Sequence, residues 1–160
     1  MMYEKWVERP TFLFYVMENI RKIIEKHIPS DIELLSFNYN SRSSFIKIVI
    51  DSRDHISVDE TALLARNIKN DNSIASYFPE GVRLEVGTPG IGSELERTFQ
   101  YEKNIGKYIE LEYFEKGEIM KNTFVLIDIE KDGIVVGTKN KKNDILFIDI
   151  KSAKIKVSFD

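Results

Sequence analysis

The stretch Thr88-Pro89-Gly90-Ile91-Gly92 divides this chain of 160 residues into two parts. It places one proline and two glycines between long segments that carry regular apolar patterns. Proline fixes its backbone and lacks an N–H donor, while glycine adopts conformations closed to other residues, so this composition is typical of a tight connection. We therefore predict two domains, residues 1–90 and residues 91–160.

The part before this junction has the patterns of mixed helix and strand. Apolar residues between positions 13 and 27 recur at three-and-four spacing, which predicts an amphipathic helix over about residues 10–28, ended by Pro29. Alternating residues 32–39 and the β-branched run 45–51 flank a polar turn. These two strands are predicted to form a hairpin.

A second helix is predicted to start at a capping box, Ser57-Val58-Asp59-Glu60, in which the Ser57 hydroxyl bonds the Glu60 amide and the Glu60 side chain reaches back. We expect it to reach about Ile68 and to bury Val58, Ala62, Ala65 and Ile68, or their neighbours. A helical turn at 74–78 and a strand at 82–88 follow. The order αββαβ predicts a sandwich-like α/β domain, with two helices on one face of a three-stranded sheet.

The part after the junction has the pattern of an all-β domain, preceded by one helical turn at 99–104. The pair Asp132-Gly133 is a strong hairpin signal. The predicted strands are residues 107–114, 123–130, 134–138, 145–150 and 154–159. Five short strands joined by tight turns favour a small closed barrel, whose closure removes exposed sheet edges. The fold class is therefore α+β.

Composition and charge limit the classes of function. A content of 42% hydrophobic and 31% charged residues indicates a globular chain, and the lack of cysteine excludes disulfides and thiolate metal sites. The N-terminus lacks a signal-peptide layout and no apolar run approaches the roughly 20 residues that span a bilayer, so we expect a cytoplasmic protein without membrane contact. The net charge of −3, with no basic excess in either part, argues against a general nucleic-acid binder. A local patch or a basic protein partner remains open.

One compact basic turn contains Lys139, Lys141 and Lys142, together with Asn140 and Asn143. At the end of a barrel such a turn can contact RNA phosphates. A solvated loop that blunts a strand end explains the same residues equally well.

The sequence contains no recognisable set of catalytic residues. The two histidines, His27 and His55, have no third ligand at metal-like spacing, and Ser57 is explained as a helix cap. The acids around residues 51–60 fit no calcium loop, so capping and solvation are favoured over cation binding. The junction lacks the Walker and dinucleotide patterns, which favours a hinge or a partner-binding linker. We predict no enzyme activity and no cofactor.

A family resemblance appears at the junction. Leu84-Glu85-Val86-Gly87-Thr88-Pro89-Gly90-Ile91, followed by Leu95, resembles the signature of the ribosome maturation factor RimP family, which reads Leu-Glu-Val-Ser-Ser-Pro-Gly-Leu and then Asp-Arg-Pro-Leu. The order of the other segments agrees, from the strand that ends in Asp51 to the closing segment 150–155. The chain departs from the family at Gly87-Thr88 and at Gly92-Ser93-Glu94, so it resembles a divergent member in which Arg97 is the candidate substitute for the family's arginine.

The resemblance implies an N-terminal α/β domain, a C-terminal Sm-like (Src-homology-type) β-barrel and no catalysis. It also implies binding to the immature small ribosomal subunit, through a small-subunit protein and rRNA, by a protein expected to be monomeric. The lysines of the basic turn are then the candidate rRNA contacts. The candidate partner-binding linker residues are Gly87, Thr88, Pro89, Gly90, Ile91, Gly92 and Arg97. The alternative is an Sm-like RNA-binding or protein-interaction module unrelated to ribosomes.

Overall fold

A computed structural model describes residues 10–157 as an α+β chain with two separate sheets. The chain divides into two compact units: unit 1 ends at Thr88, and unit 2 begins at Pro89. Each unit has its own hydrophobic core, with no buried residue in common. Within the described residues, every helix is too short or too polar to cross a bilayer.

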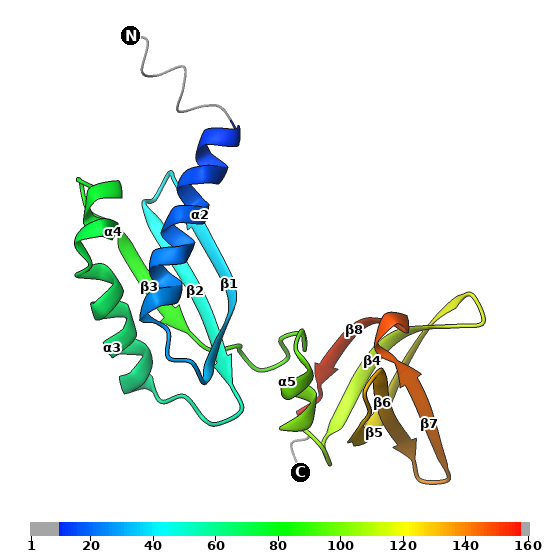
Figure 1. The fold of residues 1–160 in the computed structure, drawn as a ribbon. Coiled ribbons are helices and arrows are strands. Elements are labelled where there is room, and N and C mark those ends of the chain that lie inside the picture. The colour runs from blue at the N-terminus through cyan, green and yellow to red at the C-terminus, as the bar shows by residue number, and fades with distance from the viewer. Residues whose placement is uncertain (1–9, 158–160) are drawn as a thin grey trace. The chain divides into compact units, whose positions relative to one another are not determined.

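The sheet of unit 1 has three strands in the order β1-β2-β3 (Figure 1). β1 (Ile32–Asn40) and β2 (Phe45–Ser52) are antiparallel, which confirms the predicted hairpin. β3 (Arg83–Gly87) lies parallel to β2, with Ile48 opposite Val86. Parallel neighbours need a long crossover connection, and the helical segment between β2 and β3 provides it.

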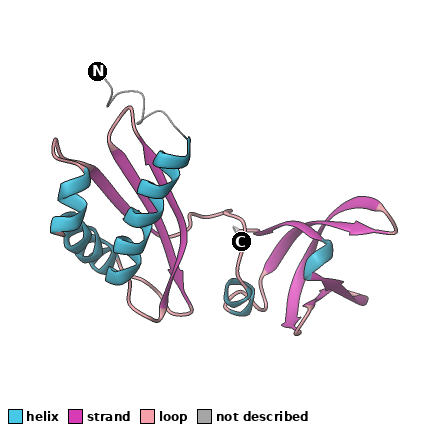
Figure 2. Ribbon diagram, turned by 45° about the horizontal axis from the view of Figure 1, so that its top comes forward, coloured by secondary structure: helices cyan, strands magenta, loops and turns pink. Residues whose placement is uncertain are grey.

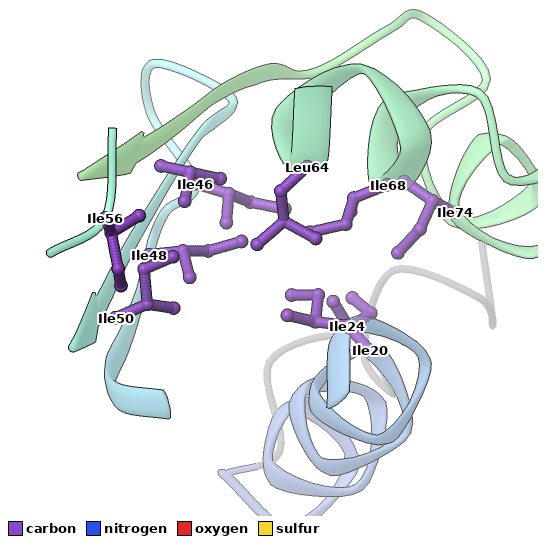
Figure 3. Close-up of a cluster of buried hydrophobic side chains, with 10 residues drawn as sticks. Ile20, Ile24, Ile46, Ile48, Ile50, Ile56, Leu64, Ile68 and Ile74 are labelled. Carbon is purple, nitrogen blue, oxygen red and sulfur yellow. The ribbon is translucent and has the colours of Figure 1, made fainter. Parts of the chain in front are cut away.

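Three helices cover one face of this sheet, as Figures 1 and 2 show: α2 (Pro10–His27), α3 (Val58–Lys69) and the short α4 (Asn72–Tyr77). Figure 3 shows where the two layers meet. Buried isoleucines of α2 and β2 face Leu64 and Ile68 of α3 and Ile74 of α4. The core residues that the figure labels are Ile20, Ile24, Ile46, Ile48, Ile50, Ile56, Leu64, Ile68 and Ile74.

The buried face of α3 differs in part from the prediction. Ile68 is buried as expected, but Val58 is 83% exposed and Ala62 is also exposed. Leu64, four residues before Ile68, takes their place. Side chains in a helix lean toward its N-terminus. Because Val58 is the first helical residue, its side chain projects beyond the first turn and away from the core.

Unit 2 contains α5 (Thr98–Glu102) and a five-stranded antiparallel sheet in the order β7-β6-β5-β4-β8 (Figure 1). Its core gathers side chains from several of these strands, among them Leu111 and Leu126, which have no exposed surface. β7 and β8 form the two ends of the sheet, and no ladder joins them within residues 10–157. The closed barrel predicted from the sequence is therefore not found. The strands are β4 (Tyr108–Glu115), β5 (Glu118–Ile129), β6 (Gly133–Thr138), β7 (Lys141–Leu146) and β8 (Ile150–Ile155).

Three strand predictions in unit 2 were wrong in their bounds. β5 starts five residues early, because Lys116 and Gly117 both adopt positive φ, at 51° and 84°, and make a two-residue turn that leads directly from β4 into β5. β7 contains the polar run that was predicted as a loop, and a 3-10 helix, η1 (Phe147–Asp149), occupies half of the strand predicted at 145–150. β8 accordingly begins at Ile150, and the end of the predicted strand, residues 158–159, lies outside the described residues.

Candidate partner-binding site

The linker is an exposed segment that starts at the end of β3. Gly87 is the last residue of β3, and Thr88, Pro89 and Gly90 follow without regular structure. The N–H of Ser93 donates to the carbonyl of Gly90 at 3.1 Å and closes a turn over Ile91 and Gly92. Gly92 has a φ of 76°, which a residue with a side chain rarely adopts. The side chain of Ile91 is left 87% exposed, so the turn presents an apolar group to solvent.

The segment after this turn is fixed to β8. Leu95 donates its N–H to the carbonyl of Ala153 at 2.8 Å, and Glu94 forms an isolated antiparallel bridge with Lys154. The Glu94 carboxylate accepts a hydrogen bond from the Ser152 hydroxyl at 3.0 Å and lies 3.8 Å from the Lys154 ammonium. The end of the linker therefore has a fixed place within unit 2.

A buried glutamine holds the next two residues in place. Gln100 is 2% exposed, and its Oε1 accepts the N–H groups of Glu96 and Arg97 at 2.7 and 2.9 Å. Asn104 donates from its amide to the Gln100 carbonyl at 2.7 Å and secures α5 from the other side. Arg97 is the N-cap residue of α5, and its side chain is exposed. The structure thus places Arg97 on the same segment as the linker, five residues after Gly92.

A pocket of about 400 Å³ opens between this segment and β8. Its apolar wall includes the rings of Tyr101 and Phe147, which meet edge to face with centroids 5.4 Å apart. Burial and the nearby charge of Glu94 raise the pKa of Tyr101 to about 12, so its hydroxyl remains protonated at neutral pH. Sequence reasoning missed this pocket. The one available signal was Tyr101, an aromatic residue within the helical turn predicted at 99–104.

The pocket has a polar rim as well as an apolar wall. Two acids, Glu94 and Glu96, come from the segment after the linker, and Lys151 and Ser152 come from β8. Leu95, Ile150 and Ala153 complete the apolar part. Such a mixture suits a ligand that has both a flat apolar surface and a positive charge.

The predicted basic turn is part of a hairpin. Lys139 and Asn140 form the two-residue turn between β6 and β7, whereas Lys141 and Lys142 belong to β7, opposite Thr138 and Gly137. Successive residues of a strand point to opposite faces of the sheet. The structure therefore brings the three lysines to one end of the hairpin but divides Lys141 from Lys142.

The remaining candidates have structural roles. The capping box is confirmed: the N–H of Glu60 donates to Ser57 Oγ at 3.2 Å, and the N–H of Ser57 donates to Glu60 Oε2 at 2.7 Å. Asp51 is buried and accepts the N–H of Ser52 at 2.9 Å. His27 bonds Asp71. Within the described part of the chain, no three histidine, aspartate or glutamate side chains gather as a metal site would require.

Comparison with protein families addresses unit 1 and the linker. Residues 23–92 match the family model described as the RimP N-terminal domain. The matched region includes the whole three-stranded sheet with α3 and α4, and it ends at Gly92, within the turn that follows β3. This agrees with the resemblance carried by residues 84–91. The match therefore supports the assignment of the chain to the RimP family.

Proposed function

We propose that this protein assists assembly of the small ribosomal subunit by binding the immature particle. The observation that carries the proposal is the match of residues 23–92 to the RimP N-terminal domain. On this proposal the protein acts in the cytoplasm as a monomer, without a cofactor and without catalysing a reaction. Its partners are a small-subunit ribosomal protein and rRNA.

The proposed mechanism requires only a difference in affinity. A factor that binds the immature particle more tightly than the mature one stabilises the immature conformation and is released as maturation removes its binding site. Two units with separate cores can each supply a rigid surface for this purpose. The linker adds the exposed side chain of Ile91, and Arg97 adds a positive charge nearby in sequence.

The C-terminal unit is proposed to be an Sm-like barrel. Two observations support this. β8 returns to pair with β4, so the last strand of the unit lies beside its first. The strands at the two ends of the sheet, β7 and β8, are joined by the three residues of η1 alone. On this proposal the sheet curls into a small, open barrel in which β7 and β8 stay unpaired, as they are within residues 10–157.

The proposed rRNA contact is the turn between β6 and β7. Lys139, Lys141 and Lys142 are all exposed there, and lysine contacts to phosphate carry no sequence preference. The overall charge of −3 restricts such a contact to a local patch. The proposal therefore assigns only part of the binding energy to RNA and the rest to protein.

Co-sedimentation tests the proposed function directly. Small subunits at different stages of maturation are isolated from cells that lack the gene and mixed with the purified full-length protein. We expect the protein to sediment with immature small subunits in preference to mature ones. Equal binding to both, or no binding to either, would refute the proposal. Precursor profiling in the deletion strain is the complementary measurement, and immature small subunits should accumulate.

A further inference from the structure

The pocket beside β8 contains a hydroxyl group without a partner. Tyr101 is 5% exposed, and its phenol makes no hydrogen bond within residues 10–157. Among the described residues, every fully buried side-chain oxygen has a hydrogen-bond partner. Because the phenol oxygen of Tyr101 has none, it cannot be fully buried and must reach solvent. The surface that Tyr101 lines is the pocket. A nearly buried side chain thus offers an unused polar atom to a ligand there.

The charges around the pocket are unevenly compensated. Glu94 is bonded to Ser152 and paired with Lys154, and Lys151 lies 3.8 Å from the carboxylate of Glu112. The carboxylate of Glu96 has no partner in the described part of the chain, while its backbone is fixed by Gln100. One positioned negative charge therefore remains at the pocket and favours a cation there.

The strand beside the pocket has an open outer edge. β8 is the last strand of its sheet, and the bridge between Glu94 and Lys154 occupies only one end of that edge in the described structure. Lys151, farther along, is a bulge residue without an opposite residue on β4. Because unpaired strand edges accept extended peptides through main-chain hydrogen bonds, this edge suits a segment in β conformation.

We propose that the pocket binds an arginine side chain from an extended, basic segment of a partner protein that lies along the outer edge of β8. The planar guanidinium can lie against the rings of Tyr101 and Phe147, donate to the phenol oxygen and pair with Glu96. An RNA strand is disfavoured because the carboxylates of Glu94 and Glu96 repel phosphate. The identification of the partner as a small-subunit ribosomal protein rests on the proposed function. The inference that the pocket binds an arginine side chain does not depend on it.

A peptide experiment tests the pocket by itself. The probe is a fluorescent peptide of alternating valine and arginine, and its control carries citrulline, which keeps the shape of arginine but lacks the charge. We expect the full-length protein to bind the arginine peptide at least about tenfold more tightly than the citrulline peptide. Glu96→Gln should remove most of this difference, and Tyr101→Phe, which keeps the ring, should reduce it. Glu118→Gln, at an exposed position at the start of β5, is the matched control and should bind as the wild type does.

Equal affinity for the two peptides, or unchanged binding by both pocket variants, would overturn the inference. The sign of the Glu96→Gln effect also separates the two kinds of macromolecule. Loss of a negative charge weakens binding to a basic protein segment but strengthens binding to RNA. If Glu96→Gln tightened binding to a single-stranded RNA oligonucleotide and left the arginine peptide unaffected, the pocket would belong to an RNA site and the inference would be wrong.

The same variants on immature small subunits separate the inference from the proposed function. Wild-type protein that fails to sediment with the particles contradicts the proposed function, whatever the peptide experiment shows. If the wild type, Glu96→Gln and Tyr101→Phe sediment equally well, the inference about the partner fails while the proposed function stands. We expect the two pocket variants to lose about tenfold in affinity for the particle and Glu118→Gln to lose none.

Discussion

Nε2 of His27, at the end of α2, lies 2.7 Å from Oδ2 of Asp71, the N-cap residue of α4. The other carboxylate oxygen of Asp71 accepts the N–H of Ser73 at 2.7 Å. One side chain thus caps α4 and joins it to α2. The hydrogen bond from His27, followed by that from Ser73, lowers the pKa of Asp71 below its ordinary value.

This lowered pKa predicts a loss of stability in acid. The unfolded chain takes up the proton of Asp71 at a higher pH than the folded protein does, so folding is favoured while the carboxylate is ionised. The contribution of Asp71 is complete above the ordinary aspartate pKa and is lost as the pH falls through the lowered pKa. We expect Asp71→Asn to make the urea midpoint of unit 1 less dependent on pH below about pH 4. Asp31→Asn is the control, and an equal flattening there would contradict the prediction.

The capping box of α3 predicts a second stability effect. Ser57→Ala removes the acceptor of the Glu60 N–H and should lower the free energy of unfolding of unit 1 by about 1 kcal/mol. Urea denaturation followed by circular dichroism measures this change. Ser43→Ala, in the exposed turn between β1 and β2, is the control, and it should change the midpoint little.

Local patterns were enough to predict several elements. The α2 periodicity, the β1–β2 hairpin and the capping box each depend on residues close in sequence, and the structure confirms all three. β7 could not be found in this way. Its first four residues, Lys141 to Asp144, are polar, and they form a strand because their backbone pairs with β6. Pairing of this kind leaves no apolar alternation for a sequence pattern to detect.

The pocket could not be predicted from the sequence for a related reason. It exists because Leu95 bonds Ala153, which brings the acids that follow the linker next to β8, far along the chain. The sequence predicted strands in this part but not their order, and β8 itself was placed four residues too late. A site formed by two segments that are distant in sequence can be predicted only when the pairing between those segments is known. The linker, by contrast, could be predicted from local sequence, because proline and glycine favour a tight connection.

The separate cores predict independent unfolding. Ile48 and Leu111 have no exposed surface and belong to different cores. Ile48→Ala should lower the stability of unit 1, and Leu111→Ala that of unit 2, by about 2 to 5 kcal/mol each. Hydrogen exchange measured by mass spectrometry should show faster exchange only in the unit that carries the substitution. A loss of protection in both units from either variant would show that the units unfold together.

Gly133 predicts a steric effect at the start of β6. A Cβ atom at this position would overlap the backbone carbonyl of Ile145 on the neighbouring β7, which cannot move aside as a flexible side chain would. Gly133→Ala should therefore destabilise unit 2 by about 1 to 3 kcal/mol. At Gly90 the nearest atom to an added Cβ is the Ser93 hydroxyl oxygen at 3.8 Å, an ordinary contact. Gly90→Ala is thus the control, and equal destabilisation by both variants would rule out the steric explanation.

The division of the basic turn predicts an uneven response to lysine substitution. Each lysine that contacts a phosphate adds about 1 to the slope of the logarithm of affinity against that of salt concentration. Lys139 is in the turn itself, whereas Lys141 and Lys142 point to opposite faces of the sheet. An RNA surface that approaches from one side can meet only one of those two.

We therefore expect Lys139→Gln to lower the salt slope of binding to immature small subunits by about 1. One of the two single variants Lys141→Gln and Lys142→Gln should lower the slope by the same amount. The other variant should leave the slope unchanged. Lys131→Gln, an exposed lysine just before β6 and thus at its opposite end, is the control. If all four variants changed the slope equally, the lysines would act through net charge alone. If none did, the turn would not contact RNA, and a protein partner would have to supply the binding energy.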